Sequence, residues 1–114
     1  MENQKIKLMR SIKLTDKQIS VIVGTLLGDG YLDKTTMGRS LRLHHSKSQE
    51  AYVLWKYNIL KNIVNSEPRT YKTKENTTKM YFRTVSHPYL IDLQKLFYIN
   101  GKKIFPGKFL EKTF

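Results

Sequence analysis

The sequence predicts an α+β domain in which three helices alternate with two β-hairpins. In three segments the apolar residues recur with the spacing of an amphipathic helix, and in four shorter segments apolar and polar residues alternate as in strands. Turn-forming residues separate the paired strands. We therefore expect the order helix, hairpin, helix, hairpin, helix in one domain at 15–114, preceded by a loosely attached basic arm at 1–14.

The first predicted helix begins at Thr15 and leads into a strand near Tyr31. Thr15 and Gln18 have the spacing of a capping box, in which each side chain satisfies the backbone N–H of the other residue. Gly30 is the expected end of the helix, in the left-handed conformation that glycine adopts readily. One apolar stripe should face the core, made of Ile19, Ile22, Val23 and Leu26.

A second stripe on the same helix consists mostly of small residues, namely Val21, Gly24, Thr25 and Gly28. Each glycine inside a helix lowers helix stability by about 1 kcal/mol relative to alanine. Two glycines four residues apart therefore indicate that something else requires the absence of side chains. Close approach of another backbone is such a requirement. We expect this helix to lie between its own domain and a second body, with Asp29 at the end of the contact.

Residues 22–30, with the sequence IVGTLLGDG, resemble the LAGLIDADG motif of homing endonucleases. Both internal glycines, the acidic residue Asp29 and the final Gly30 match, while Leu27 stands where the namesake motif has a second acidic residue. With the predicted element order, the resemblance extends from Thr15 to the C-terminus. It implies an αββαββα half-domain whose four-stranded antiparallel sheet binds double-stranded DNA in the major groove, and whose motif helix packs beside that of a second half-domain.

Composition agrees with a nucleic-acid partner. Lys and Arg number 21 against 9 Asp and Glu, a net charge of +12, which favours a polyanion. A Lys-rich proteome encoded by an AT-rich genome is the alternative cause. There is no long apolar run for a membrane span and no cysteine for disulfides or thiolate metal sites. We expect an intracellular location, in an organelle such as the mitochondrion or in a bacterial cytoplasm.

Both predicted hairpins carry a cationic face. In Arg39–His45, Leu41 and Leu43 should face the helices and Arg42, His44 and Ser46 should face outward. In the second hairpin, at 69–74 and 79–84, the inward residues should be Tyr71, Met80 and Phe82, and the outward ones Thr70, Lys72, Lys74, Lys79, Tyr81 and Arg83. The residues expected to contact DNA are Arg39, Arg42, His44, Ser46, Arg69, Lys72, Lys74, Lys79 and Arg83.

Two more helices complete the predicted domain. The second, at 49–64, should bury a stripe made of Ala51, Leu54, Trp55, Asn58 and Ile59, with Trp55 as its largest core residue. The third should be capped by Ser86, tolerate Pro88 in its first turn and end at Asn100-Gly101. His87 is expected to be a capping or surface residue.

Asp29 is the first candidate for chemistry. A carboxylate at the C-terminal end of a helix, together with the carbonyl of Gly28, offers the oxygen ligands that Mg²⁺ prefers, although an Asp-Gly pair is also common in plain turns. The resemblance assigns metal binding to Asp29 and implies a basic group at the end of the second strand. Lys47 is our first candidate for that group and His44 or His45 the second.

The resemblance implies a metal-dependent, site-specific DNA endonuclease. Ser46 stands where many relatives have Gln, so the group that positions water stays open. No second motif follows in this sequence, so the chain either pairs with an identical copy or is the front half of a two-motif enzyme. Two alternatives remain. One is a module that binds nucleic acid without cutting it, such as an intron RNA maturase or splicing cofactor. The other is a basic structural protein of the ribosomal kind.

Overall fold

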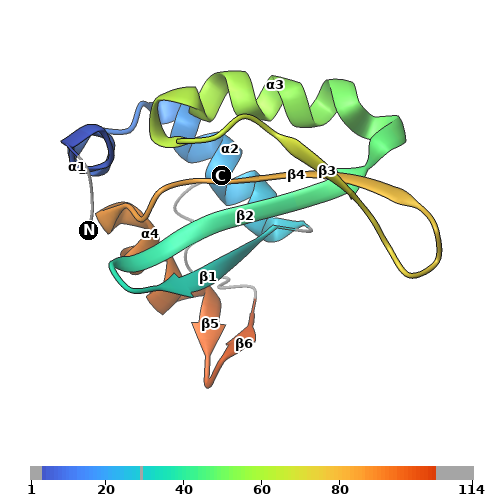
Figure 1. The fold of residues 1–114 in the computed structure, drawn as a ribbon. Coiled ribbons are helices and arrows are strands. Elements are labelled where there is room, and N and C mark those ends of the chain that lie inside the picture. Colours follow the sequence, from blue (N-terminus) through green and yellow to red (C-terminus); the bar gives the residue numbers. More distant parts are fainter. Residues whose placement is uncertain (1–3, 29, 105–114) are drawn as a thin grey trace.

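A computed structural model describes residues 4–28 and 30–104 of the chain (Figure 1). Asp29 and the C-terminal residues 105–114 lie outside this part. The helices are α1 (Gln4–Ser11), α2 (Asp16–Leu27), α3 (Glu50–Leu60) and α4 (Pro88–Phe97), with short 3-10 turns η1 (Lys47–Gln49) and η2 (Lys61–Ile63) around α3. The strands are β1 (Tyr31–Thr35), β2 (Gly38–Ser46), β3 (Arg69–Lys72), β4 (Thr78–Arg83), β5 (Tyr98–Ile99) and β6 (Lys102–Lys103).

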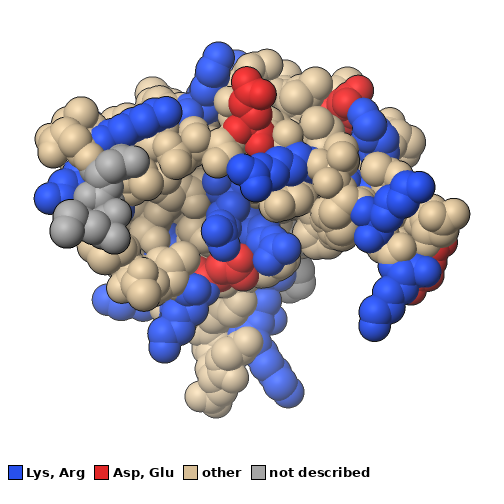
Figure 2. Space-filling view, in the orientation of Figure 1, with Lys and Arg blue, Asp and Glu red and all other residues tan. Residues whose placement is uncertain are grey.

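The first four strands form one antiparallel sheet in the order β1-β2-β4-β3, which confirms the predicted architecture. Helices α2, α3 and α4 pack on one face of it. The opposite face is open, and Figure 2 shows Lys and Arg side chains gathered around a hollow there. No helix among the described residues is long and apolar enough to cross a bilayer.

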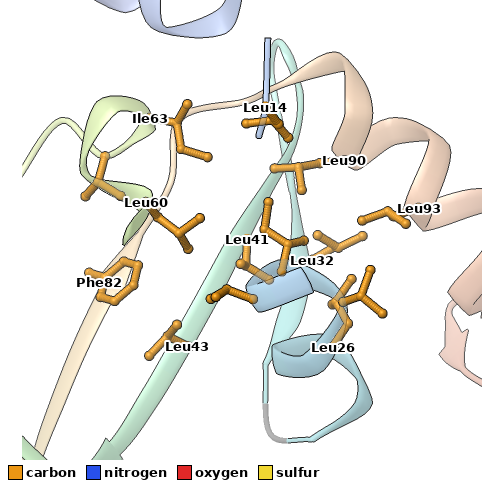
Figure 3. Packing of buried hydrophobic residues seen from close by; sticks show 14 of the residues in the cluster. Leu14, Leu26, Leu32, Leu41, Leu43, Leu60, Ile63, Phe82, Leu90 and Leu93 are labelled. Carbon is orange, nitrogen blue, oxygen red and sulfur yellow. The ribbon is translucent and has the colours of Figure 1, made fainter. Parts of the chain in front are cut away.

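The core lies between this sheet and the helices (Figure 3). Leu41 and Leu43 of β2 are buried as predicted, and so is Phe82 of β4, which pairs with Leu43. The predicted stripe of α2 is also confirmed, since Ile22 and Leu26 have no exposed surface. Alternation along β2 and β4 and the helical spacing of α2 therefore point their apolar side chains at one another.

The start of α2 is as predicted, but its end is not. The Gln18 N–H donates to Thr15 Oγ1 at 3.1 Å, and the Thr15 N–H donates to Gln18 Oε1 at 3.0 Å. The C-cap is Gly28 rather than Gly30, and among the described glycines only Gly38 and Gly101 have positive φ. Gly30 is needed for another reason: a Cβ there would lie 2.3 Å from Thr25 Cγ2. Its N–H donates to the Thr25 carbonyl at 2.9 Å, which holds the chain close to the helix.

Helix α3 faces the core with a different side from the one predicted. Its buried residues are Val53, Lys56 and Leu60, whereas Trp55 is 50% exposed and Leu54 37% exposed. Apolar residues occupy most positions of this helix, so their spacing did not single out one face. The Lys56 stem is buried, and its ammonium lies 4.4 Å from the centre of the Tyr52 ring.

The faces of β3 are also opposite to those predicted. Arg69 pairs with Tyr81 and Tyr71 with Lys79, so Tyr71 lies on the open face of the sheet, and Thr70 and Lys72 lie on the other. All four residues of this edge strand are exposed. Because no helix covers it, its side chains carry no burial pattern from which a face could be inferred.

The two ends of the domain differ from expectation as well. The basic arm contains the helix α1, whose Met9 is buried. His87, not Ser86, caps α4: its Nδ1 accepts from the Tyr89 N–H at 3.2 Å. Asn100 and Gly101 form a turn with φ values of 51° and 79°, which joins β5 to β6 instead of ending a helix.

The capping box predicts a measurable effect on stability. Thr15→Ala removes the acceptor for the Gln18 N–H and should lower the free energy of unfolding by about 1 kcal/mol. Urea unfolding followed by circular dichroism measures the change. Ser20→Ala also removes a side-chain hydroxyl, at an exposed position of α2, and should not lower the free energy of unfolding, because alanine has the higher helix propensity. Equal losses in the two variants would contradict the role of the cap.

Candidate active site and nucleic-acid interface

The open face of the sheet brings together most of the predicted contact residues. Cross-strand pairing sets Arg42 opposite Arg83, His44 opposite Tyr81 and Ser46 opposite Lys79 on this face. Arg69 joins them from β3. An open hollow of about 1050 Å³ lies over the part of this face that carries Arg42, Arg69 and Arg83. This surface is cationic, concave and as wide as the sheet.

Arg42 is the most constrained cation on this face. Its guanidinium lies 3.6 Å from Asp33 Oδ2 and 5.8 Å from the ring centres of both Tyr31 and Tyr81. Such contacts fix the direction of the planar donor group. Its cross-strand neighbour Arg83 carries a like charge, an arrangement that is unfavourable unless an anion lies nearby.

Three predicted contact residues lie elsewhere. Arg39 alternates with Ser40 and Arg42 along β2, so it lies on the face of Leu41, and Lys72 shares the face of Thr70. Lys74 lies in the turn between β3 and β4. Sequence reasoning proposed no nucleic-acid contact for the aromatic residues of the open face, which are Tyr31, Tyr71 and Tyr81. The alternation along β1 could have placed Tyr31 on the open face, because its neighbour Leu32 faces the core.

The end of α2 is an electronegative point that holds a cation. The Lys103 ammonium donates to the carbonyl of Gly28 at 2.9 Å and to that of Gly30 at 2.7 Å. These groups belong to the C-terminal end of a helix, where the backbone dipoles concentrate negative charge. Sequence reasoning missed Lys103, because it is 75 residues from Gly28 in the chain and belongs to no local motif.

The two carbonyl oxygens at the end of α2 are ligands of the kind that a hard cation binds. Two backbone oxygens converge on one positive group, and Mg²⁺ uses such oxygens together with carboxylates. Asp29, the predicted carboxylate, lies outside the described residues. Within the described part of the chain, no cluster of three or more His, Cys, Asp or Glu side chains forms a metal site by itself.

The predicted basic residue Lys47 lies just after β2, in η1. Its ammonium forms an ion pair with Glu50 one turn later, and both side chains are 46% exposed. Ser46 caps η1 by accepting from the Ser48 N–H at 3.4 Å. His44 lies edge-on to Tyr31 with 6.2 Å between ring centres, and His45 packs against Tyr52. His44 and His45 are thus engaged with aromatic rings on opposite faces of β2.

The small-residue stripe of α2 is only partly free. Val21 and Thr25 are buried within the domain, at 9% and 2% exposure. Gly24 and Gly28 are exposed, and a Cβ added to Gly24 would meet nothing within 4 Å. The glycine side of the helix is therefore open to a second backbone.

Comparisons with known proteins agree with this architecture. The family model described as "LAGLIDADG DNA endonuclease family" matches residues 19–113. The chain is 31% identical over 96 residues to the DNA endonuclease I-ChuI of Chlamydomonas applanata, covering 76% of this chain and 44% of that protein. It is 32% identical over 104 residues to a protein RecA of Mycolicibacterium chitae, covering 87% of this chain and 23% of that protein.

A solved structure shows the same fold. The homing endonuclease I-WcaI bound to its DNA recognition sequence superposes with a TM-score of 0.75 at 23% identity, over 91% of this chain and 49% of that one. The chain thus spans about a quarter to a half of the length of these relatives.

The Arg42–Arg83 pair predicts a cost in stability. Arg83→Thr removes one of two opposed like charges and should raise the free energy of unfolding by up to about 1 kcal/mol at low salt, with less gain at high salt. Urea unfolding at two ionic strengths measures both effects. Lys72→Thr is the matched control, because Lys72 pairs with the uncharged Thr78. The same gain in both variants would contradict cross-strand repulsion as its cause.

Proposed function

The chain belongs to the LAGLIDADG DNA endonuclease family, and we propose that it is one half of a site-specific homing endonuclease that cuts both strands of a DNA duplex. The observation that carries the proposal is the open cationic face of the sheet, which ends beside the C-terminus of the motif helix α2. A sheet of this width enters the major groove, where Arg and Lys reach base edges and phosphates.

The proposal requires a second half-domain. Cutting two strands needs two sets of reacting groups, and this chain has one motif helix. The open side of Gly24 and Gly28 supports backbone-to-backbone packing of α2 against a second helix. The partner is either an identical copy or a further domain of a longer chain. The 49% coverage of the I-WcaI chain is compatible with both.

The proposed chemistry is Mg²⁺-dependent hydrolysis at the end of α2. Asp29 and the Gly28 carbonyl would hold the ion, which when bound would supply an activated water and charge stabilisation on the leaving oxygen. The Gly28 carbonyl has two lone pairs, so it can serve both an ion and Lys103. Lys103 would add positive charge where the attacked phosphate becomes more negative. Lys47 stays our candidate for orienting the phosphate, released from Glu50 when DNA binds.

Cleavage of a plasmid library tests the proposed function. Supercoiled plasmids with randomised inserts are incubated with the protein and Mg²⁺, and linear products are sequenced across the break. We expect one enriched target with wild-type protein and none with Asp29→Asn, which keeps the shape of the side chain but loses its charge. Asp92→Asn is the control, an exposed carboxylate on α4. Undiminished cutting by Asp29→Asn would contradict the mechanism. Binding without any cutting would contradict an identical copy as the second half-domain, and it would favour either a further domain of a longer chain in that place or the non-cleaving alternative.

The contacts of Lys103 predict a separation of binding from cleavage. Lys103→Met removes the positive charge beside the Gly28 and Gly30 carbonyls and should slow cleavage by roughly 10²- to 10³-fold, the usual effect of losing one charge-stabilising group. Affinity for the target without divalent ions should stay the same. Lys102→Met removes an exposed charge from the same strand and should leave both quantities unchanged. Parallel loss of affinity and cleavage would instead indicate a role in folding or DNA binding.

A further inference from the structure

Helix α1 packs against the rest of the domain. Met9 is buried, and α1 packs against η2. Just after it, the Ile12 carbonyl accepts from His87 Nε2 at 2.6 Å, while His87 Nδ1 accepts from the Tyr89 N–H. This hydrogen bond ties the segment after α1 to the start of α4. In Figure 1, α1 lies beyond one end of the sheet.

One side of α1 lines the cavity over the open face. Ile6 and Arg10 are one helical turn apart and both belong to the cavity wall, together with residues of β1, β2 and β4. Lys5 and Lys7 are exposed and do not line it. The helix therefore presents one cation to the cavity and others to solvent.

The cavity concentrates positive charge. Its wall contains five cations, which are Arg10, Lys34, Arg42, Arg69 and Arg83. Glu67 is the one acidic residue among its lining residues, and nearby Asp33 is already engaged with Arg42. Five basic side chains against one carboxylate give the lining a net positive charge, which favours a ligand with several negative charges at fixed spacing, as in a nucleic-acid backbone.

We propose that α1 is a side wall of the DNA-binding surface and that Arg10 contacts a phosphate of the strand bordering the groove that the sheet enters. The inference rests on the proposed function, because it takes the open face as the DNA-binding face. The major groove is about 12 Å wide and bordered by phosphates on both sides, so an element standing beside an inserted sheet meets the backbone and not the bases. Contacts of this kind position the protein and are indifferent to sequence.

The salt dependence of binding tests this role. Fluorescence anisotropy measures the affinity of the full chain for one labelled duplex of about 30 base pairs over a range of salt, and the slope of log K against log[salt] counts released counterions. Arg10→Gln should make the slope shallower by about 0.9 per bound chain. Arg10→Lys should keep it, because lysine also binds phosphate. Lys7→Gln removes the same charge from the exposed side of α1 and should keep the wild-type slope.

Two outcomes would overturn the inference: equal slopes for Arg10→Gln and Lys7→Gln, or a loss in Arg10→Lys as large as in Arg10→Gln. Ile6→Glu provides a second test if Arg10→Gln unfolds, since it places a negative charge in the cavity wall and should weaken binding at least several-fold at low salt. Unchanged binding by a folded Ile6→Glu variant would also overturn it. Failure of the wild-type protein to bind any duplex contradicts the proposed function itself, whereas binding with equal slopes contradicts the role of α1 alone.

Discussion

The packing of α2 against the sheet is the constraint on which the other features depend. Ile22, Val23 and Leu26 are fully buried, and truncating one such residue to alanine typically costs about 2–5 kcal/mol. With this side fixed, the opposite side of the helix must face outward, and it carries Gly24 and Gly28. The same packing sets where α2 ends, and therefore where its carbonyls point. A single buried stripe thus determines both a contact surface and the position of the candidate active site.

The end of α2 shows how distant parts of the chain are combined. Its negative partial charge attracts a cation, and the small β5–β6 hairpin supplies one in Lys103. The hairpin exists because Asn100 and Gly101 adopt positive φ, the geometry of a tight turn between antiparallel strands. The backbone conformation of two residues at a turn therefore places the charge of a third beside the motif helix.

Prediction from the sequence succeeded where apolar residues mark a single face of an element and failed where the pattern marks none or several. Along β2 and β4 the covering helices force apolar residues to alternate, and those faces were predicted correctly. Edge strand β3 lacks such a cover, so its faces were inverted. Helix α3 is apolar on several sides, and the prediction buried Trp55 where the fold uses Val53 and Leu60. Lys103 could not be found at all, since its relation to α2 exists only in three dimensions.

The cations of the open face repel one another, and this repulsion should lower the stability of the free domain. A fold selected for stability alone would not place Arg42 opposite Arg83. Asp33 and two tyrosine rings hold Arg42 in place without cancelling the charge of its neighbours. In the proposed complex with DNA, phosphates replace this repulsion with attraction, so relieving it adds to the affinity. Folding and the proposed DNA binding therefore place opposite demands on the same side chains, and the buried core beneath the sheet supplies the stability that the open face lacks.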